Sequence, residues 1–494
     1  MNNSNEPSMD QLNILFNLCN SNKYQEAIEK ANQLLQIYPK SANLYNILGA
    51  SLNFLKLFDH AINAYKEAIA INPTAETIYN NLGNAQKNNG DLKASIESFE
   101  NAININPNYA EAYYNLGITN FIKRDYDASF KNFSKSLEVK PNLGDSYYNI
   151  ANIHYEKKEY DLAIKNYNKA VELIPNHFDS FNNLGNVYKD IKNYKMSLKC
   201  YLLALEINPN LSNTKKNLGE LYYSLKDYEK AKKCFQEFND AKSVAKVIEC
   251  SYQNGNINDF ITEINKVKLK NECNVRVAAI STFGCNQFKI KDIYPFCHNP
   301  EKLFLIDNLE NYIQDYLTYI QNLSNEVESF DNIWETPHTT TRNGFQTTGN
   351  LFSDCSNNLK ILEKIITNQL DQYFKKYYNP SYSLFKNWPT NLKLNGWYVK
   401  LLQEGHQESH IHPDGLVSGV FYLKVVQNPT EYEGAIELSQ HGYNYKVLSH
   451  DYPRIIHQPK IGDLILFPSS LFHKTIPVKQ NVERCVIAFD LLPA

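Results

Sequence analysis

Small and apolar residues recur along the first half of the chain with a period of 34 residues. The period is clearest for proline, which occurs at Pro39, Pro73, Pro107, Pro141, Pro175 and Pro209. Proline ends a helix because its ring cannot continue it and because it biases the preceding residue away from helical dihedrals. Each block of 34 residues therefore predicts a pair of helices followed by a stop.

Two further columns follow the same register. A small residue recurs in the first helix, at Gly49, Gly83, Gly117, Ala151, Gly185 and Gly219, and an aromatic one in the second, at Tyr65, Phe99, Phe133, Tyr167, Tyr201 and Phe235. Small residues let helices approach closely, and the aromatic rings fill the gaps between them. The pattern resembles the tetratricopeptide repeat, and it predicts about seven helix-turn-helix units over residues 9–245. After Phe235 the register is lost, and residues 246–275 predict a helical cap or connector.

The second half changes from helical to strand-like patterns. Two amphipathic stretches, Leu303–Leu323 and Leu359–Tyr377, predict helices on either side of a polar loop, His338–Asn350. Alternating apolar runs then predict strands over Leu392–Leu402, Val417–Val426, Ala435–Leu438, Ile455–Gln458, Asp463–Phe467 and Arg484–Leu491. Short strands of this kind favour an antiparallel double sheet, a double-stranded β-helix or jelly roll with flanking helices, over residues 276–494. Residues 1–8 predict a disordered tail. The fold class is multidomain, an all-α solenoid followed by a β domain.

Composition narrows the choice of partners. The chain has 494 residues, enough for two or three domains, and its formal net charge is −3. That balance gives no electrostatic reason to expect nucleic acid or an anionic membrane as a partner. No run of about 18 apolar residues occurs, and the first residues lack a secretory pattern, so we expect a cytoplasmic protein without a membrane partner. The nine scattered cysteines predict reduced thiols.

Three histidines near the C-terminal end have the spacing of a metal site. His410 and His412 are two positions apart, so on a strand their imidazoles point to the same face. His473 follows a separate predicted strand and can supply the third ligand. Asp414 offers an alternative, because His412, Asp414 and His473 would form the two-histidine, one-carboxylate set that holds non-haem Fe(II). The turn signal around Pro413 also allows Asp414 to be a turn residue.

Arg484 opens the last predicted strand and is followed by apolar residues. A guanidinium in that place is suited to a carboxylate, which it can bind through two parallel hydrogen bonds. Tyr422 lies in a second apolar run and could donate its hydroxyl to the same carboxylate. The alternatives are an exposed arginine at a strand end and a core tyrosine.

These motifs together resemble a bacterial family of 2-oxoglutarate- and Fe(II)-dependent oxygenases over about residues 290–494. The resemblance is carried by the segments Gly405–Gln407, His410–Pro413, Ser418–Tyr422, Leu466–Ser469, His473, Glu483–Arg484 and Ala488–Asp490. It implies Fe(II), 2-oxoglutarate and O2 as cofactor and cosubstrates. It favours His410, His412 and His473 as the metal-binding and catalytic set, with Arg484 and Tyr422 binding the cosubstrate. His406, Trp397 and Gln346 are candidates for contacts to the ligands or to the substrate.

An asparagine column in the repeats, Asn81, Asn115, Asn149, Asn183 and Asn217, is a candidate peptide-binding ladder. Such amides could bind the backbone of an extended peptide along the groove, or they could bond a neighbouring helix. The leading hypothesis is therefore a hydroxylase whose repeats recruit a protein or peptide substrate. The alternatives are a cupin-like metalloprotein, which would have no need of Arg484, and a scaffold with a non-catalytic C-terminal domain.

Overall fold

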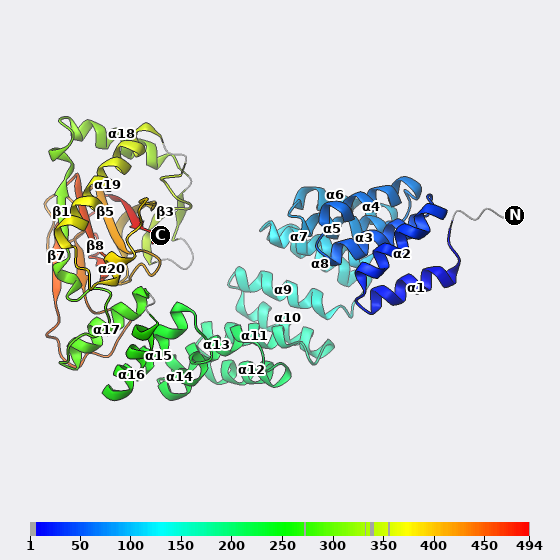
Figure 1. The fold of residues 1–494 in the computed structure, drawn as a ribbon, viewed down its shortest axis with the longest axis horizontal. Coiled ribbons are helices and arrows are strands. Elements are labelled where there is room, and N and C mark those ends of the chain that lie inside the picture. The colour runs from blue at the N-terminus through cyan, green and yellow to red at the C-terminus, as the bar shows by residue number, and fades with distance from the viewer. Residues whose placement is uncertain (1–5, 271–272, 331, 336–339, 354–355, 494) are drawn as a thin grey trace. The chain divides into compact units, whose positions relative to one another are not determined.

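The computed structural model describes residues 6–270, 273–330, 332–335, 340–353 and 356–493. The chain divides into two compact units, Met1–Leu221 and Tyr222–Ala494, which we call the repeat unit and the sheet unit (Figure 1). Each unit has its own hydrophobic clusters, and each is described by itself below. The predicted domain bounds of 9–245, 246–275 and 276–494 stay a prediction.

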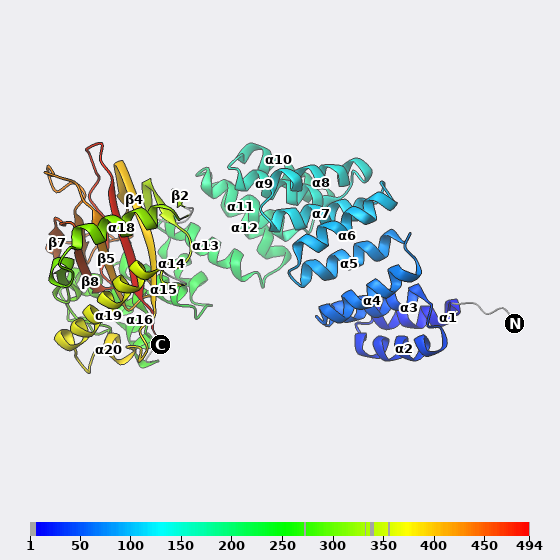
Figure 2. The same cartoon turned by 90° about the horizontal axis from the view of Figure 1, so that it is seen from above.

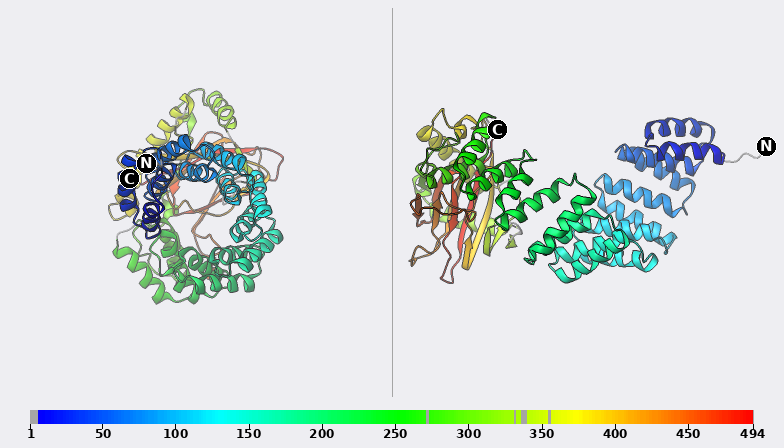
Figure 3. Two further views of the ribbon diagram at one scale, coloured as in Figure 1. Left: turned by 90° about the vertical axis from the view of Figure 1, so that its right-hand side faces the viewer. Right: turned by 90° about the horizontal axis from the view of Figure 1, so that it is seen from below.

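The repeat unit consists of helical hairpins that follow one another side by side, as Figure 3 shows. Ser8 is the N-cap of the first helix and accepts a hydrogen bond from the Gln11 backbone. Of the tail predicted over residues 1–8, residues 1–5 lie outside the described residues. The helices are α1 (Met9–Asn20), α2 (Tyr24–Ile37), α3 (Ala42–Phe54), α4 (Phe58–Ile71), α5 (Glu76–Asn88), α6 (Leu92–Ile105), α7 (Ala110–Ile122), α8 (Tyr126–Val139), α9 (Gly144–Glu156), α10 (Tyr160–Leu173), α11 (Phe178–Asp190), α12 (Tyr194–Ile207) and α13 (Ser212–Ser224).

The small and aromatic columns meet inside each hairpin, as the sequence predicts. A Cβ atom built on Gly185 would lie 2.4 Å from a ring carbon of Tyr201, and Gly83 stands in the same relation to Phe99 at 2.7 Å. Both rings are completely buried. The glycine is therefore needed for close approach, because any side chain there would occupy the volume of the ring.

Helices also form the first part of the sheet unit. They are α14 (Tyr228–Phe235), α15 (Ala241–Gln253), α16 (Ile257–Leu269) and α17 (Val275–Gln287), with α18 (Tyr316–Glu328), α19 (Asn357–Tyr377), α20 (Ser383–Lys386) and the short 3-10 turns η1 (Pro300–Lys302) and η2 (Leu309–Asn311) further on. One hydrophobic cluster runs from Ile248 of α15 to Phe489 of the last strand. Most of the described residues of the segment 246–275 are therefore helical, and their apolar side chains share a core with the sheet.

In the part of the chain that the structure describes, ten strands form two antiparallel sheets. The larger sheet has the order β1-β8-β5-β10-β4-β3-β2, and the smaller one has the order β7-β6-β9. The strands are β1 (Leu305–Asn308), β2 (Asn332–Trp334), β3 (Thr341–Thr347), β4 (Leu394–Gln407), β5 (Val417–Lys424), β6 (Ile436–Ser439), β7 (Arg454–His457), β8 (Asp463–Pro468), β9 (Phe472–Thr475) and β10 (Arg484–Leu491). The all-helical repeat unit and the antiparallel sheet domain are as predicted.

Alternation along the strands divides the larger sheet into two faces. On β10, Ile487 and Phe489 pack in the cluster that contains Leu362 of α19, whereas Val486 packs with Leu438 of the smaller sheet. Helices α18 and α19 lie along the first of these faces, as Figure 2 shows. Arg484 and Asp490, which share the face of Val486, consequently point into the space between the two sheets.

Two local predictions were wrong. The stretch Leu303–Leu323 is not one helix: it begins with β1 and η2, and α18 starts only at Tyr316, where Asp315 accepts a hydrogen bond from the Thr318 backbone. Leu305–Asn308 pair with β8, and this pairing outweighs the helical pattern. The predicted loop His338–Asn350 contains β3, which pairs with β4. Residues 338 and 339 lie outside the described residues.

Strand β9 was not predicted, because Phe472 is the single strongly apolar residue among its four and gives no apolar alternation. All cysteines among the described residues are free thiols, and Cys355 lies outside them. In the part of the chain that the structure describes, no helix combines the length and apolar character needed to cross a bilayer.

Candidate metal centre

His410, His412 and His473 converge between the two sheets. One ring nitrogen of each lies within 4.8 Å of the others. His473 lies on β9, and its backbone exchanges two hydrogen bonds of 3.0 Å with the backbone of His410, so that the two residues face each other across a β-bridge. His412, two residues on, turns its ring to the same side. Tertiary pairing therefore brings together residues that are 61 to 63 positions apart in the sequence.

The other ring nitrogen of each histidine faces a hydrogen-bond acceptor. Nδ1 of His410 lies 2.7 Å from the Glu408 carbonyl oxygen, and Nδ1 of His473 lies 3.3 Å from that of Leu471. Nδ1 of His412 lies 2.6 Å from Oδ1 of Asp490. A carbonyl or carboxylate oxygen only accepts, so each Nδ1 carries the proton and each Nε2 keeps its lone pair. Hydrogen bonds of this kind orient metal-binding histidines in proteins.

The Nε2 atoms of His410 and His412 are only 3.1 Å apart. With both protons on Nδ1, two lone pairs face each other, an arrangement that a cation between them would stabilise. Imidazole nitrogens are ligands that divalent transition metals prefer. The three imidazoles therefore fit a divalent transition metal.

Burial keeps His410 and His473 neutral. Burial and, to a smaller extent, the nearby His412 ring together lower the pKa of His410 from 6.5 to about 3. The pKa of His473 is also well below its usual value, because this side chain is buried and faces two other imidazoles. Neutral imidazole is the form that binds a metal, so protons compete little with the ion at neutral pH.

Arg484 lines the same narrow cavity as the three histidines. Its side chain is only 2% exposed. Nε donates to the Gly434 carbonyl oxygen at 2.8 Å, and one terminal nitrogen, Nη2, donates to the Tyr422 hydroxyl at 3.3 Å. The other, Nη1, is buried and has no hydrogen-bond partner among the described residues. A buried guanidinium without a carboxylate beside it is costly, and it is an anchor for an anion.

Tyr422 was predicted beside this arginine, and the structure brings the two together. The tyrosine is buried on β5, and its ring centroid lies 5.0 Å from the guanidinium carbon. Burial raises the pKa of Tyr422, and the arginine opposes that effect. The hydroxyl therefore stays protonated and keeps a hydrogen to donate.

Of the remaining predicted residues, three border the mouth of the site and one does not. Trp397 and Gln346 line the mouth of the site, and the Trp397 ring packs on His412 with centroids 5.3 Å apart. Asp414 also borders the mouth, but it is exposed in a turn and is not among the three converging ligands. His406 lines neither the mouth nor the cavity, whereas its neighbour Gln407 lines both, because side chains alternate along β4.

Asp490 is the main residue that the motif analysis did not assign. Its Oδ1 atom accepts from His412 and also from the Ser418 hydroxyl at 2.7 Å, and Ser418 in turn contacts Ser469 at 2.8 Å. The period of two along β10 could have identified it, since Arg484 and Asp490 are an even number of positions apart. Asp490 holds the His412 ring and places a negative charge next to it.

The asparagine column joins neighbouring repeats. The amide nitrogen of Asn81 donates to Asn46, that of Asn115 to Asn80 and that of Asn217 to Asn182, while Asn149 and Asn183 donate to Tyr114 and Tyr148, each 35 positions earlier. These distances range from 2.9 to 3.4 Å. The donors thus form contacts between repeats. A role in binding an extended peptide stays a prediction.

Comparisons with known families agree with this division of the chain. Residues 395–490, which contain the three histidines, Arg484 and Asp490, match the family described as "Putative 2OG-Fe(II) oxygenase". Models of the tetratricopeptide repeat match residues 58–90, 88–123, 110–143, 151–192, 178–211 and 217–242. The chain therefore combines tetratricopeptide repeats with a segment that matches the model of the family described as "Putative 2OG-Fe(II) oxygenase", as the sequence motifs predicted.

Among solved structures, the crystal structure of MamA is 25% identical and covers 34% of this chain and 97% of its own, with a TM-score of 0.31. YrrB, described as a TPR protein with an unusual peptide-binding site, is 19% identical and covers 37% of this chain and 95% of its own, with a TM-score of 0.31. The pilF protein of Pseudomonas aeruginosa is 18% identical, covers 41% of this chain and 95% of its own, and has a TM-score of 0.36. A comparison with curated proteins found no match.

Proposed function

We propose that the sheet unit is an Fe(II)- and 2-oxoglutarate-dependent oxygenase that hydroxylates a protein or peptide substrate. The observation that carries the proposal is a single cavity lined both by three converging imidazoles and by a buried arginine with an unpaired donor. The imidazoles supply a metal site, and the arginine supplies an anchor for a carboxylate. A cupin-like metal site would use the first of these features and not the second.

In this proposal His410, His412 and His473 hold the iron through Nε2. Their Nδ1 protons are engaged by fixed acceptors, so the rings are oriented before the ion binds. Three neutral ligands leave the full charge of the ion uncompensated. Asp490, hydrogen-bonded to His412, supplies one negative charge in the next layer of residues and takes over part of the role that a ligating carboxylate has in related sites.

Arg484 holds the distal carboxylate of 2-oxoglutarate through its free Nη1 donor, and the Tyr422 hydroxyl donates to the same group. Replacing water by a carboxylate in this cavity satisfies the buried guanidinium, which favours binding of an acid over a neutral analogue. Bound Fe(II) with 2-oxoglutarate and O2 supplies the oxidising chemistry, in which 2-oxoglutarate becomes succinate and CO2 and the substrate gains a hydroxyl group. The walls, which include Val420, Ile436 and Phe467, exclude bulk water.

The remaining features follow from the same proposal. The two antiparallel sheets on either side of the site support a jelly-roll fold for this domain. In this proposal the repeats over 9–245 recruit the protein or peptide substrate. The free thiols of the described cysteines are typical of a reducing compartment, which supports the predicted cytoplasmic location.

Anaerobic absorption spectroscopy tests the site directly. Purified protein with Fe(II) should develop a visible charge-transfer band when 2-oxoglutarate is added, and the His473→Ala protein should not. Lys375→Gln, an exposed change on α19 away from the cavity, is the control for handling and iron content. If wild-type protein binds Fe(II) but shows no band with 2-oxoglutarate, the cosubstrate assignment is wrong. If it binds no metal, the whole proposal is wrong.

A further inference from the structure

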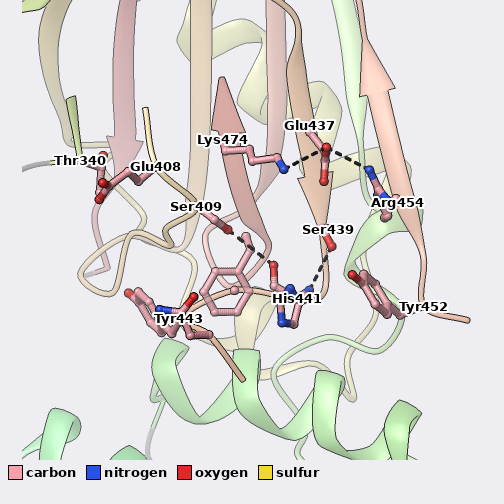
Figure 4. A pocket seen from close by; sticks show the side chains of 13 residues that line it. Thr340, Glu408, Ser409, Glu437, Ser439, His441, Tyr443, Tyr452, Arg454 and Lys474 are labelled. Carbon is pink, nitrogen blue, oxygen red and sulfur yellow. Dashed lines mark hydrogen bonds and ion pairs between the residues drawn. The ribbon is translucent and has the colours of Figure 1, made fainter. Parts of the chain in front are cut away.

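A second cavity, of about 610 Å³, lies on the outer side of the smaller sheet. We call it the outer groove and define it by Ser409, Glu437, Ser439, Tyr443, Arg454 and Lys474, which line it (Figure 4). Its floor follows from strand alternation. Ile436 and Leu438 of β6 point into the core, so Glu437 and Ser439 point the other way.

The outer groove adjoins the metal centre. Ser409 immediately precedes His410, and Lys474 immediately follows His473, so the same two chain segments present ligands to one side and groove residues to the other. Tyr443 and Thr340 line both the outer groove and the mouth of the metal site. A chain that enters the mouth can therefore continue into the groove past Tyr443.

One end of the groove is cationic. Arg454 of β7 and Lys474 of β9 lie on the two strands that flank β6, and both approach the same oxygen of Glu437, at 3.2 and 3.3 Å (Figure 4). Glu437 is buried, whereas the two cationic side chains are 51% and 42% exposed. Two cations share one carboxylate, which leaves one net positive charge and unused donors facing the groove. Glu408, the other acid on the rim, already pairs with Arg342 at 3.1 Å.

The other end is aromatic and held in place. Tyr443 packs edge-on against Phe472 with centroids 4.9 Å apart, and Tyr452 packs against His441. Tyr443 and Asn444 both have positive φ, 48° and 57°, a conformation that costs free energy for a tyrosine. The packing of Tyr443 on Phe472 holds the ring in this conformation, at the junction of the two cavities.

We propose that the outer groove binds an acidic peptide segment of the substrate, with a carboxylate at Arg454 and Lys474 and an aromatic side chain near Tyr443 and Tyr452. The assignment of this peptide as a substrate rests on the oxygenase function proposed above. The binding itself does not. Half-exposed cations attract an anion with little desolvation, and the aromatic rings offer apolar area beside them.

Fluorescence anisotropy with three labelled octapeptides tests the proposal on the full chain. The peptides alternate tyrosine with glutamate, glutamine or lysine. We expect the glutamate peptide to bind most tightly, and to bind less tightly as the salt concentration rises. Arg454→Gln and Lys474→Gln should each weaken it by about threefold to fivefold, as expected for a half-exposed ion pair. Each variant leaves Glu437 one cation, so the fold is retained.

The control is Lys375→Gln, which removes the same charge from the exposed side of α19 and should leave the affinity unchanged. Equal affinities for the three peptides, or loss of affinity in the control as large as in the groove variants, would overturn the proposal. The Fe(II) and 2-oxoglutarate absorption band is recorded on the same proteins. If the glutamate peptide binds selectively and this binding depends on Arg454 and Lys474, the outer groove is supported as a peptide site, whether or not the band appears. If the band is absent while this binding is present, only the oxygenase function is wrong.

Discussion

At the scale of single residues, Arg484 combines two opposite effects. Its charge is buried beside a carbonyl, a hydroxyl and no carboxylate, which costs folding free energy. The same charge is what an acidic ligand needs. Arginines retained under these conditions are typical of binding sites rather than of cores, and the two effects can be separated by experiment.

We therefore expect Arg484→Met to leave the ligand-free sheet unit at least as stable as wild type. The same change should weaken 2-oxoglutarate binding by about 30-fold or more, since losing one partner of a buried charge pair costs 2–5 kcal/mol. Denaturant unfolding and an anaerobic 2-oxoglutarate titration measure the two quantities. A large loss of stability with unchanged binding would show that the arginine is structural.

Asp490 illustrates a residue that acts through another. In Asp490→Asn the side-chain oxygen can still accept from His412, but the negative charge is gone. We expect affinity for Co(II), measured by its absorption in the site, to fall by about 10- to 100-fold. Ser418→Ala is the matched control, because it removes the second hydrogen bond to the carboxylate and keeps its charge. Equal affinities of the Asn variant and wild type would contradict this role.

Burial of His410 and His473 predicts a pH dependence of metal-free protein. Both pKa values lie below the unfolded value of about 6.5, that of His410 at about 3, so the unfolded state binds more protons between these limits. Stability is full above about pH 6.5 and falls as pH drops towards 3, by up to about 1.4 kcal/mol per pH unit for each group. The double variant His410→Gln/His473→Gln should show a shallower decline in urea unfolding. Identical slopes for both proteins would be inconsistent with this explanation.

At the scale of elements, the repeat hairpins depend on one close approach each. In Gly185→Ala, the better helix propensity of alanine contributes up to about 1 kcal/mol, whereas forcing a methyl group against the Tyr201 ring costs about 1–3 kcal/mol. The ring cannot move easily, because its hydroxyl bonds Asn186 at 2.7 Å and the ring is buried. We expect net destabilisation of the repeat unit, measured by far-UV circular dichroism. Glu67→Ala, on an exposed helix face, is the control and should be neutral or slightly stabilising.

The strands of the sheet unit show how one element serves two purposes. On β10, alternate residues either join the core beneath α18 and α19 or face the metal centre. On β9, His473 faces the metal centre, whereas Lys474 borders the same cavity and also reaches the outer groove, where it pairs with Glu437. A shift of one residue in register would exchange the two sets, so the pairing of β9 with β6 and with His410 determines whether a site exists.

At the scale of the whole molecule, the two compact units predict two unfolding transitions. All three tryptophans, Trp334, Trp388 and Trp397, belong to the sheet unit, so their fluorescence reports that unit alone. A divalent metal at 100 times its dissociation constant should stabilise the tryptophan transition by about 2.7 kcal/mol and leave the helical transition of the repeat unit in place. Addition of a chelator should reverse the shift. A metal-dependent shift of both transitions together would contradict independent units.

The repeat unit could be predicted almost completely from the sequence. Its contacts are local, so a 34-residue register of prolines, glycines and aromatic rings specifies both the helices and their packing. The candidate metal ligands could also be named, because two imidazoles at positions i and i+2 share a face on any strand. In both cases the physical information lies within one turn, one strand or one repeat of the residue concerned.

Tertiary structure decided the rest. Only the pairing of β9 brings His473 opposite His410, and only the stacking of two sheets buries Arg484 beside the same cavity. Strand pairing at Leu305–Asn308 outweighs the helical pattern of Leu303–Leu323. Asp414 lies in a turn, and the carboxylate that contacts His412 is that of Asp490, on a strand distant in the sequence. Contacts between residues far apart in the chain determine which side chains are buried and which groups they bind, and local sequence patterns do not predict such contacts.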